Sequence, residues 1–283
     1  MEGDVTADAG AGTLYIVSTP IGNMGDFSFR AVEVLKSVTL VLAEDTRHTR
    51  HLLDHYGVQT VMKPYHEHNE ARATPELIDR LRAGASLALV SDAGTPLLSD
   101  PGARLVHAAI EAGIDVVPLP GASALLAALV ASGLDVGRFT FHGFLERSGR
   151  VRRQALEEIL SARHTSVLFE SPGRLVATLG ELEKRGGGDR SAAVAREMTK
   201  QFEEVRRGTV SELRAYYGGT PPKGEIVIVI AAAPARAASN ELVRERVRAL
   251  RRSGVSARDA ATSVARELGV ARRVAYKLAQ EES

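Results

Sequence analysis

Short apolar segments alternate with amphipathic segments along the first half of the chain. These segments predict β-strands at residues 13–19, 38–43, 61–66, 87–90 and 114–117, of which the first and fourth are expected to be buried. The segments between them place apolar residues at helical spacing and predict helices that end near Gly57, Gly84, Gly113 and Gly133. Strands that alternate in this way with helices of about ten to fifteen residues favour a parallel sheet, so residues 13–133 are predicted to form an α/β domain.

The same alternation continues in a second predicted α/β domain at residues 138–233. Its strands are expected at 139–144, 166–169, 192–196 and 224–233, and its helices at 151–162 and up to Lys184. Thr209 and Glu212 have the spacing of a capping box and predict the start of another short helix. The most apolar of these segments, GEIVIVIAAA, is expected to close the second sheet.

The two ends of the chain differ from these domains. Residues 1–12 are small and acidic, and they predict a disordered N-terminus. A linker is expected at 234–239, followed by a helical extension at 240–283 with three short amphipathic helices at 240–251, 256–268 and 271–280. Their spacing resembles a helix-turn-helix. The segment 240–280 has ten basic and four acidic residues, which gives +6 in a chain whose net charge is +1. Such a basic face is either solvated or bound to nucleic acid.

Composition narrows the chemistry further. The 283 residues contain no cysteine, which excludes disulfides, thiolate metal sites and a cysteine nucleophile. No apolar run reaches eighteen residues, and the first residues lack a basic start and an apolar core, so we expect a cytoplasmic protein with no membrane contact. The phosphate loop of nucleotide hydrolases, the dinucleotide fingerprint, the metalloprotease HExxH and the serine-hydrolase elbow are all absent from the sequence.

Loops of small residues follow the predicted strands. They read STPIGN at 18–23, SDAGTP at 91–96 and PLPGASA at 118–124. Asp100 and Pro101 are expected to start a helix, as N-cap and first helical residue. The carboxyl ends of parallel strands meet at one edge of a sheet, where ligands bind. The loops are therefore predicted to present backbone groups to one bulky neutral or zwitterionic ligand, and a sulfonium that bears adenosine fits this description.

Histidines offer the other candidate chemistry. His48, His51 and His55 recur at helical spacing and could hold a metal, although such rows are more often surface residues, and no metal is predicted. His66 and His68 alternate at the end of a predicted strand and are better candidates for proton transfer or phosphate contact.

The motifs in these loops resemble the tetrapyrrole-methylase superfamily, and within it the bacterial methyltransferases that act on small-subunit ribosomal RNA. The resemblance extends over about residues 13–232 and rests on LYIVSTPIGN at 14–23, AEDTRHT at 43–49, HEHNE at 66–70, SDAGTP at 91–96, PLPG at 118–121, GFL at 143–145, AREMTK at 195–200 and KGE at 223–225. It implies a two-domain α/β fold, with a parallel N-terminal and a mixed C-terminal sheet, followed by a helical extension.

The resemblance also implies a function. It is the methylation of a cytidine ribose 2′-hydroxyl in the decoding region of 16S rRNA within the 30S subunit, with S-adenosylmethionine as cofactor and a homodimeric enzyme. The cofactor residues that it implies are Pro20, Asp92, Ala93, Gly94, Thr95, Pro96, Ser123, Ala124, Leu145, Arg196, Glu197, Gly224 and Glu225.

The acceptor oxygen must be aligned with the methyl group and must lose its proton, which calls for positioning and a base. The candidates, which the sequence does not rank, are His66, Glu67, His68 and Asp45, with Lys200 as a charge stabiliser. The candidate contacts to RNA phosphates are Arg47, Arg50, Arg147, Arg150, Arg152, Arg153, Arg272, Arg273 and Lys277.

Two alternatives stay open at this point. A methylase of the same fold could act on a tetrapyrrole precursor, which would not require the basic extension. A non-enzymatic nucleic-acid-binding regulator would use that extension but would leave the loop motifs unexplained.

Overall fold

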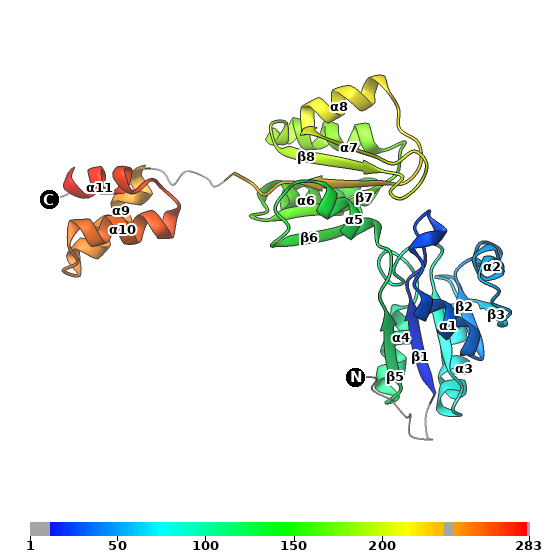
Figure 1. Ribbon diagram of the computed structural model, residues 1–283. Helices are drawn as coiled ribbons and strands as arrows, with labels where there is room; N and C mark the ends of the chain where they lie inside the picture. The colour runs from blue at the N-terminus through cyan, green and yellow to red at the C-terminus, as the bar shows by residue number, and fades with distance from the viewer. Residues whose placement is uncertain (1–11, 235–239, 282–283) are drawn as a thin grey trace. The chain divides into compact units, whose positions relative to one another are not determined.

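The computed structural model describes residues 12–234 and 240–281 (Figure 1). The chain divides into a large unit up to residue 231 and a small unit from residue 232 onward, which also includes residues 161–163. Residues 1–11, which are expected to be disordered, and residues 235–239 of the predicted linker lie outside the described residues. Gly12 is buried, and its amide donates to the carbonyl of Leu81 (2.8 Å).

The large unit begins with a five-stranded, wholly parallel sheet in the order β3-β2-β4-β1-β5. Its strands are β1 (Thr13–Val17), β2 (Leu40–Ala43), β3 (Met62–Pro64), β4 (Leu87–Val90) and β5 (Asp115–Leu119). The helices of this part are the 3-10 turn η1 (Met24–Asp26), α1 (Phe29–Ser37), α2 (Thr46–His55), α3 (Glu70–Arg82) and α4 (Ala103–Glu111). The parallel sheet predicted from the sequence is confirmed.

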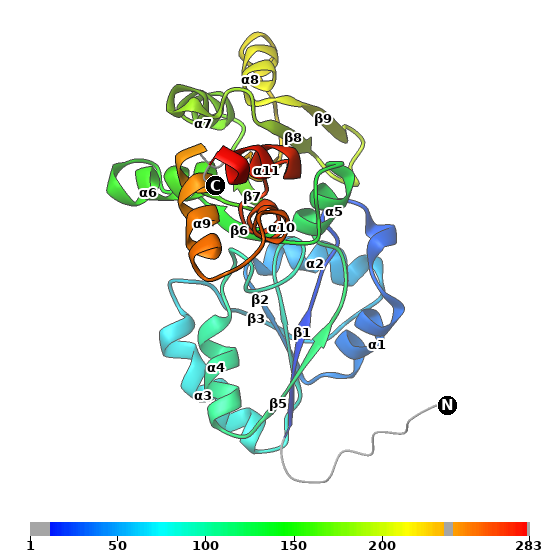
Figure 2. The same cartoon turned by 90° about the vertical axis from the view of Figure 1, so that its left-hand side faces the viewer.

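Both faces of this sheet are buried at the inner strands β2 and β4, because successive side chains of a strand point to opposite sides and helices cover both. Leu87 and Leu89 of β4 pack in the cluster that contains residues of α3 and α4, whereas Ala88 and Val90 pack in the cluster that contains residues of α1 and α2. Figure 2 shows the two pairs of helices on opposite sides of the strands. The strand β4 lies between β1 and β2. The chain continues from β4 into α4 on one face of the sheet, and from β1 and β2 into α1 and α2 on the other face. A ligand crevice is expected at such a reversal.

The second sheet of the large unit is mixed, in the order β6-β7-β10-β8-β9. Its strands are β6 (Phe139–Phe144), β7 (Thr165–Glu170), β8 (Ser191–Arg196), β9 (Glu204–Thr209) and β10 (Ile226–Ile230). Only β6 and β7 pair in parallel, and the other pairs are antiparallel. The helices of this part are α5 (Ala124–Ala131), α6 (Gly149–Ser161), α7 (Leu175–Leu182), η2 (Glu183–Gly187) and α8 (Val210–Gly219).

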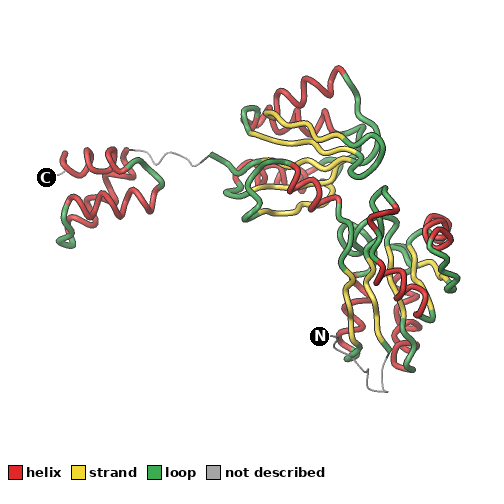
Figure 3. Tube along the Cα trace, viewed as in Figure 1, coloured by secondary structure: helices red, strands yellow, loops and turns green. Residues whose placement is uncertain are grey.

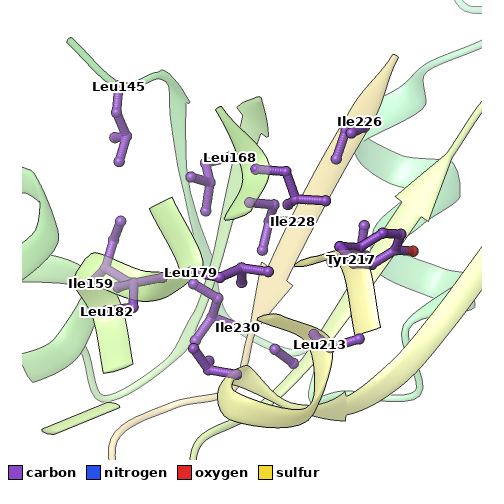
Figure 4. Packing of buried hydrophobic residues seen from close by; sticks show 14 of the residues in the cluster. Leu145, Ile159, Leu168, Leu179, Leu182, Leu213, Tyr217, Ile226, Ile228 and Ile230 are labelled. Carbon is purple, nitrogen blue, oxygen red and sulfur yellow. The ribbon is translucent and has the colours of Figure 1, made fainter. Parts of the chain in front are cut away.

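The core of this second part lies between the sheet and α6, α7 and α8. Figure 4 shows Ile228 and Ile230 of β10 among Leu179, Leu213 and Tyr217. The other face of β10 carries Val227 and Val229, which pack with residues of α5. An uninterrupted run of β-branched residues is the pattern of a strand buried on both sides, and β10 is fully buried.

The small unit consists of α9 (Asn240–Arg252), α10 (Ala257–Leu268) and α11 (Arg272–Glu281), and Figure 3 shows it as an all-helical part. Its core contains Val243, Val264 and Leu278, one from each helix. Ser256 caps α10, and Gly269 adopts a left-handed conformation (φ +64°) at the turn to α11. The three predicted helices are confirmed.

Two local predictions are wrong. Asp100 does not cap α4, which begins at Ala103 after Gly102 (φ +131°). The sequence places a helix start at Thr74 and Pro75, but α3 begins at Glu70, so Pro75 lies within its second turn. The strand β9 was not predicted, because its sequence EVRRGT is mostly polar, and β9 is an edge strand.

Candidate active site

Hydrogen bonds join the loops after β1, β4 and β5 at one edge of the first sheet. Thr19 and Gly94 exchange backbone hydrogen bonds of 2.8 and 3.1 Å. The Thr19 hydroxyl donates to the carbonyl of Ser91 (3.1 Å), and the Ser18 hydroxyl donates to Thr95 Oγ1 (3.2 Å). The Thr95 hydroxyl in turn donates to the carbonyl of Ala122 (3.5 Å), in the loop after β5. The three small-residue loops therefore meet at a single edge, as their positions after parallel strands predict.

Glycine is required where these loops approach one another. A Cβ at Gly121 would lie 2.8 Å from Ser18 Cβ and 3.2 Å from its carbonyl oxygen. Gly94 has a φ of +80°, and a Cβ there would lie 3.3 Å from Ile21. The same stretch holds Leu97 and Ser99 at φ values of +75° and +72°. Residues with side chains adopt this region at a cost, and such strain concentrates at binding sites.

A first cavity of about 440 Å³ lies between this edge and the second sheet, a volume typical of small-molecule sites. Its lining from the first part of the large unit is Ile21, Glu44, Asp92, Ala93, Gly94, Thr95, Leu98, Ser99, Asp100, Ser123 and Ala124. Its lining from the second part is Phe144, Phe169, Glu170, Ser171, Pro172, Gly224, Glu225, Ile226 and Val227. The two aromatic rings contact each other, with centroids 5.5 Å apart.

Carboxylates converge on the first cavity from different loops. Burial and the charge of Asp92 raise the pKa of Glu44. Burial, with the charge of Glu44 adding to it, raises the pKa of Asp100 to about 6. The side chain of Asp92 is held by the loop after β2, because its Oδ1 accepts a hydrogen bond from the backbone amide of Asp45 (3.1 Å). Among the described lining residues there is no Lys, Arg or His, so this cavity favours a cation.

A second cavity of about 430 Å³ opens beside the first one and shares four lining residues with it, namely Ile21, Asp92, Ala93 and Glu225. The rest of its lining consists of Thr19, Pro20, Gly22, Met24, His48, Thr49, His51, Leu52, Ser91 and Lys200. The charged and titratable groups of the two cavities therefore differ, since the second one has a lysine and two imidazoles.

Lys200 links the loop after β8 to the loop after β1. Its Nζ lies 3.0 Å from Glu197 Oε1 and 3.3 Å from Glu225 Oε1, and its side chain covers Gly22 so closely that a Cβ there would lie 2.2 Å from Lys200 Cγ. Burial opposes the charge of Lys200, but its hydrogen bonds and charge pairs with the two glutamates raise its pKa. Glu197 and Thr199 have φ values of +50° and +66°, so this loop is strained as well.

The residues that the sequence assigned to the cofactor fall into three groups. Eight line the first cavity, and they are Asp92, Ala93, Gly94, Thr95, Ser123, Ala124, Gly224 and Glu225. Pro20 lines the second cavity, while Pro96, Leu145, Arg196 and Glu197 line neither. Leu145 requires a correction, because its side chain is 4% exposed and packs in the core with α6 and α7, whereas Phe144 lines the cavity.

Of the five catalytic candidates, Lys200 is the one that lines either of these two cavities. Asp45 caps α2 and binds the side chain of Arg47 (2.8 Å), and hydrogen bonds from Arg47 lower its pKa. His66, Glu67 and His68 follow β3, the short edge strand, and line neither cavity, although His66 lies close enough to Glu44 of the first cavity to lower the pKa of that carboxyl. The sequence could not reveal this, because the order of the strands is not visible in it.

The candidate contacts to RNA phosphates differ in their exposure. Arg47, Arg147, Arg150, Arg153, Arg272, Arg273 and Lys277 are exposed, and Arg50 is half-buried. Arg152 requires a correction, because its side chain is 6% exposed and it cannot reach an RNA phosphate. Its guanidinium donates to Glu181 Oε1 (2.9 Å), Thr178 Oγ1 (2.9 Å) and the carbonyl of Glu146 (3.0 Å).

Several lining residues were missed at the level of sequence. Glu44 follows β2 directly, so the rule that ligands bind at the carboxyl edge could have found it. Phe144 and Phe169 lie at the ends of β6 and β7, and their role depends on how the second sheet faces the first. The described residues hold no helix long and apolar enough to cross a membrane, and no cluster of three or more metal-ligating side chains.

The family profile of the tetrapyrrole (corrin/porphyrin) methylases matches residues 13–214. The chain therefore belongs to this family, a class of methyltransferases. Within it, the chain is similar to proteins named ribosomal RNA small subunit methyltransferase I. The protein from Synechocystis is 47% identical, with 95% of this chain and 98% of the relative covered. The protein from Mesorhizobium japonicum is 51% identical, with 79% of this chain and 76% of the relative covered.

Solved structures confirm the two-part α/β fold. A diphthine synthase superimposes with a TM-score of 0.61 at 18% identity, covering 78% of this chain and 90% of that one. The uroporphyrin-III C-methyltransferase from Thermus thermophilus, solved with S-adenosylhomocysteine, superimposes with a TM-score of 0.57 at 20% identity, covering 78% of this chain and 97% of that one.

Proposed function

We propose that the protein methylates the 2′-hydroxyl of a cytidine ribose in the decoding region of 16S rRNA, within the 30S subunit and in the cytoplasm, with S-adenosylmethionine as methyl donor. The observation that carries this proposal is the 47% identity to a small-subunit methyltransferase I over 273 residues. The alignment covers 95% of the chain, so it includes most of the basic helical extension as well as the two sheets.

The first cavity suits the proposed cofactor. A cationic sulfonium is favoured by carboxylates, and Asp92, Glu44 and Asp100 meet there without a compensating basic side chain among the described lining residues. Phe144, Phe169 and the small residues of the 93–95 loop offer an apolar surface and backbone groups for an adenosine. S-adenosylmethionine, when bound, supplies a methyl group that is activated by its bond to a positively charged sulfur.

The chain's own contribution is to hold the acceptor and to keep water out. Alignment of two reacting groups lowers the barrier by several kcal/mol, and a positioned base adds about 10²–10⁴-fold. The walls of the first cavity come from two sheets that α5 connects. Arg207 of β9 fastens the end of α5 to the second sheet by donating to the carbonyls of Ala131 and Ser132.

Exposed basic side chains on two elements support contact with RNA. Arg47 is exposed on α2 and precedes His48, which is also exposed and lines the second cavity. Arg272, Arg273 and Lys277 are exposed on α11, the last helix of the small unit. In the small unit a short turn at 269–271 separates α10 from α11, which supports the proposed helix-turn-helix. We propose that these cations bind phosphates of the rRNA.

A homodimer is supported by α5. This helix is apolar all round, and one face of it packs on the second sheet through Leu125 and Leu129. On its other face Leu126 is 51% and Val130 is 71% exposed. A helix that is apolar on all sides is normally covered on all sides. We propose that a second copy of the chain covers this face.

One assay tests the function. Full-length protein is incubated with methyl-labelled S-adenosylmethionine and, in separate reactions, with 30S subunits that lack the modification, naked 16S rRNA and tetrapyrrole precursors. We expect label in a cytidine ribose of the 30S subunit, and Asp92→Ala should abolish it. Label on a tetrapyrrole would instead assign the chain to small-molecule methylation, and label on no substrate would favour a nucleic-acid-binding regulator.

A further inference from the structure

We propose that the second cavity is the subsite for the target nucleotide, and that Thr49, Lys200 and Glu225 act on its ribose there. This inference rests on the proposed function and deepens it, because the sequence left the acceptor site unassigned. It starts from the two neighbouring cavities, whose shared residues lie in the loops after β1 and β4 and at the start of β10.

The electrostatics of the cavities assign one ligand to each. The first cavity gathers carboxylates and suits a cation, as described above. The second is lined by His48, His51 and Lys200 as well as by the shared carboxylates Asp92 and Glu225, and the exposed Arg47 lies on the same helix as the two histidines. Lysine and imidazole groups can donate hydrogen bonds to phosphates, so RNA is better accommodated in the second cavity than in the first, whose described lining holds no Lys, Arg or His. A methyl donor in the first cavity and an acceptor in the second would meet beside Asp92 and Ala93, which line both cavities.

A buried hydroxyl without a partner lies in the wall of the second cavity. Thr49 is 2% exposed, and its Oγ1 makes no hydrogen bond to any residue that the structure describes. A buried polar atom left unpaired costs about 1–3 kcal/mol, so proteins rarely keep one without a use. Thr49 lies one turn after Asp45 on α2, and its hydroxyl is placed to bind a polar group that enters this cavity.

Lys200 and Glu225 supply the charges that the reaction needs. The ribose O–H bond breaks as the new O–CH3 bond forms, and the S–CH3 bond breaks with its electron pair remaining on the sulfur. The Lys200 ammonium stabilises the negative charge that develops on the ribose oxygen. The carboxylate of Glu225, 3.3 Å from Lys200 Nζ, accepts the proton. Its side chain is 63% exposed, so it returns the proton to water after each turnover.

The test compares two conservative variants with the wild-type enzyme. Thr49→Val removes only the hydroxyl, and Lys200→Met removes the charge while keeping a long chain over Gly22. Single-turnover methylation of 30S subunits and the Kd for S-adenosylmethionine without RNA are measured for each. We expect the rate to fall at least tenfold for Thr49→Val and about 100-fold for Lys200→Met, with cofactor Kd values within twofold of the wild type. His55→Ala, on the same helix but outside both cavities, should change neither quantity.

A second readout does not depend on turnover. Amine-reactive labelling of the wild-type protein, with S-adenosylhomocysteine bound, is followed by mass spectrometry with and without 30S subunits. The subunits should protect Lys200 at least fivefold more than Lys36 on α1. Unprotected Lys200, or wild-type rates in both variants, would overturn the subsite while leaving the proposed function intact. A wild-type enzyme that methylates no RNA would overturn both.

Discussion

Replacing Arg152 by alanine should destabilise the large unit and not merely weaken RNA binding. Its guanidinium joins Glu181 and Thr178 to the carbonyl of Glu146, and Thr178 Oγ1 in turn donates to Glu170 Oε2 (2.5 Å). Glu170 is fully buried, pairs with Arg174 (3.2 Å) and lines the first cavity. Removing one partner of a buried ion pair costs about 3–5 kcal/mol. Glu181 is 37% exposed and can regain water, which places the cost near the lower end, about 3 kcal/mol.

The matched control is Arg153→Ala, because Arg153 is the exposed neighbour on the same helix. A loss of about 3 kcal/mol corresponds to a Tm lowered by roughly 6–12 °C in a domain of this size, whereas a surface substitution changes stability by about 0.5 kcal/mol or less. Far-UV circular dichroism measures both, since the chain has no tryptophan for fluorescence. An Arg152→Ala protein that melts within about 2 °C of the wild type, but binds RNA less tightly, would refute the reasoning.

Four further outcomes are expected. The pKa of Asp100 is raised to about 6, so the folded state holds a proton that the unfolded state releases above about pH 4. The free energy of unfolding therefore falls as the pH rises from about 4 to about 6. In urea titrations Asp100→Asn should be about 1–2 kcal/mol more stable than the wild type at pH 7, but not at pH 4. Gly121→Ala should weaken cofactor binding at least tenfold by calorimetry, because its Cβ would displace Ser18. Val130→Glu should yield monomers in light scattering if α5 is the dimer face, and unchanged dimers would exclude that face. Truncation after residue 234 should lower the affinity for 30S subunits and flatten its salt dependence, and an unchanged slope would deny the extension a phosphate-binding role.

The sequence by itself determined the elements and the edge at which the site forms. Hydrophobic periodicity set most strands and helices, and the Thr209–Glu212 capping box is confirmed because both of its hydrogen bonds lie within one helical turn. Loops that follow parallel strands must meet at one edge, so SDAGTP and its two companions indicated the first cavity without knowledge of the fold. These inferences succeed because each depends on local geometry or on a rule that holds for every parallel sheet.

Only the tertiary structure decided which charged side chains belong to that site. Arg152 and Arg153 are adjacent in the sequence, yet the partners that bury Arg152 come from α7 and from the loop after β6. The histidines after β3 line neither cavity, and this depends on the strand order, which puts β3 at the edge of the sheet. Lys200 follows β8 of the second sheet, yet its side chain contacts Gly22 in the loop after β1 of the first sheet. Such choices depend on contacts between segments distant along the chain, and no local pattern encodes them.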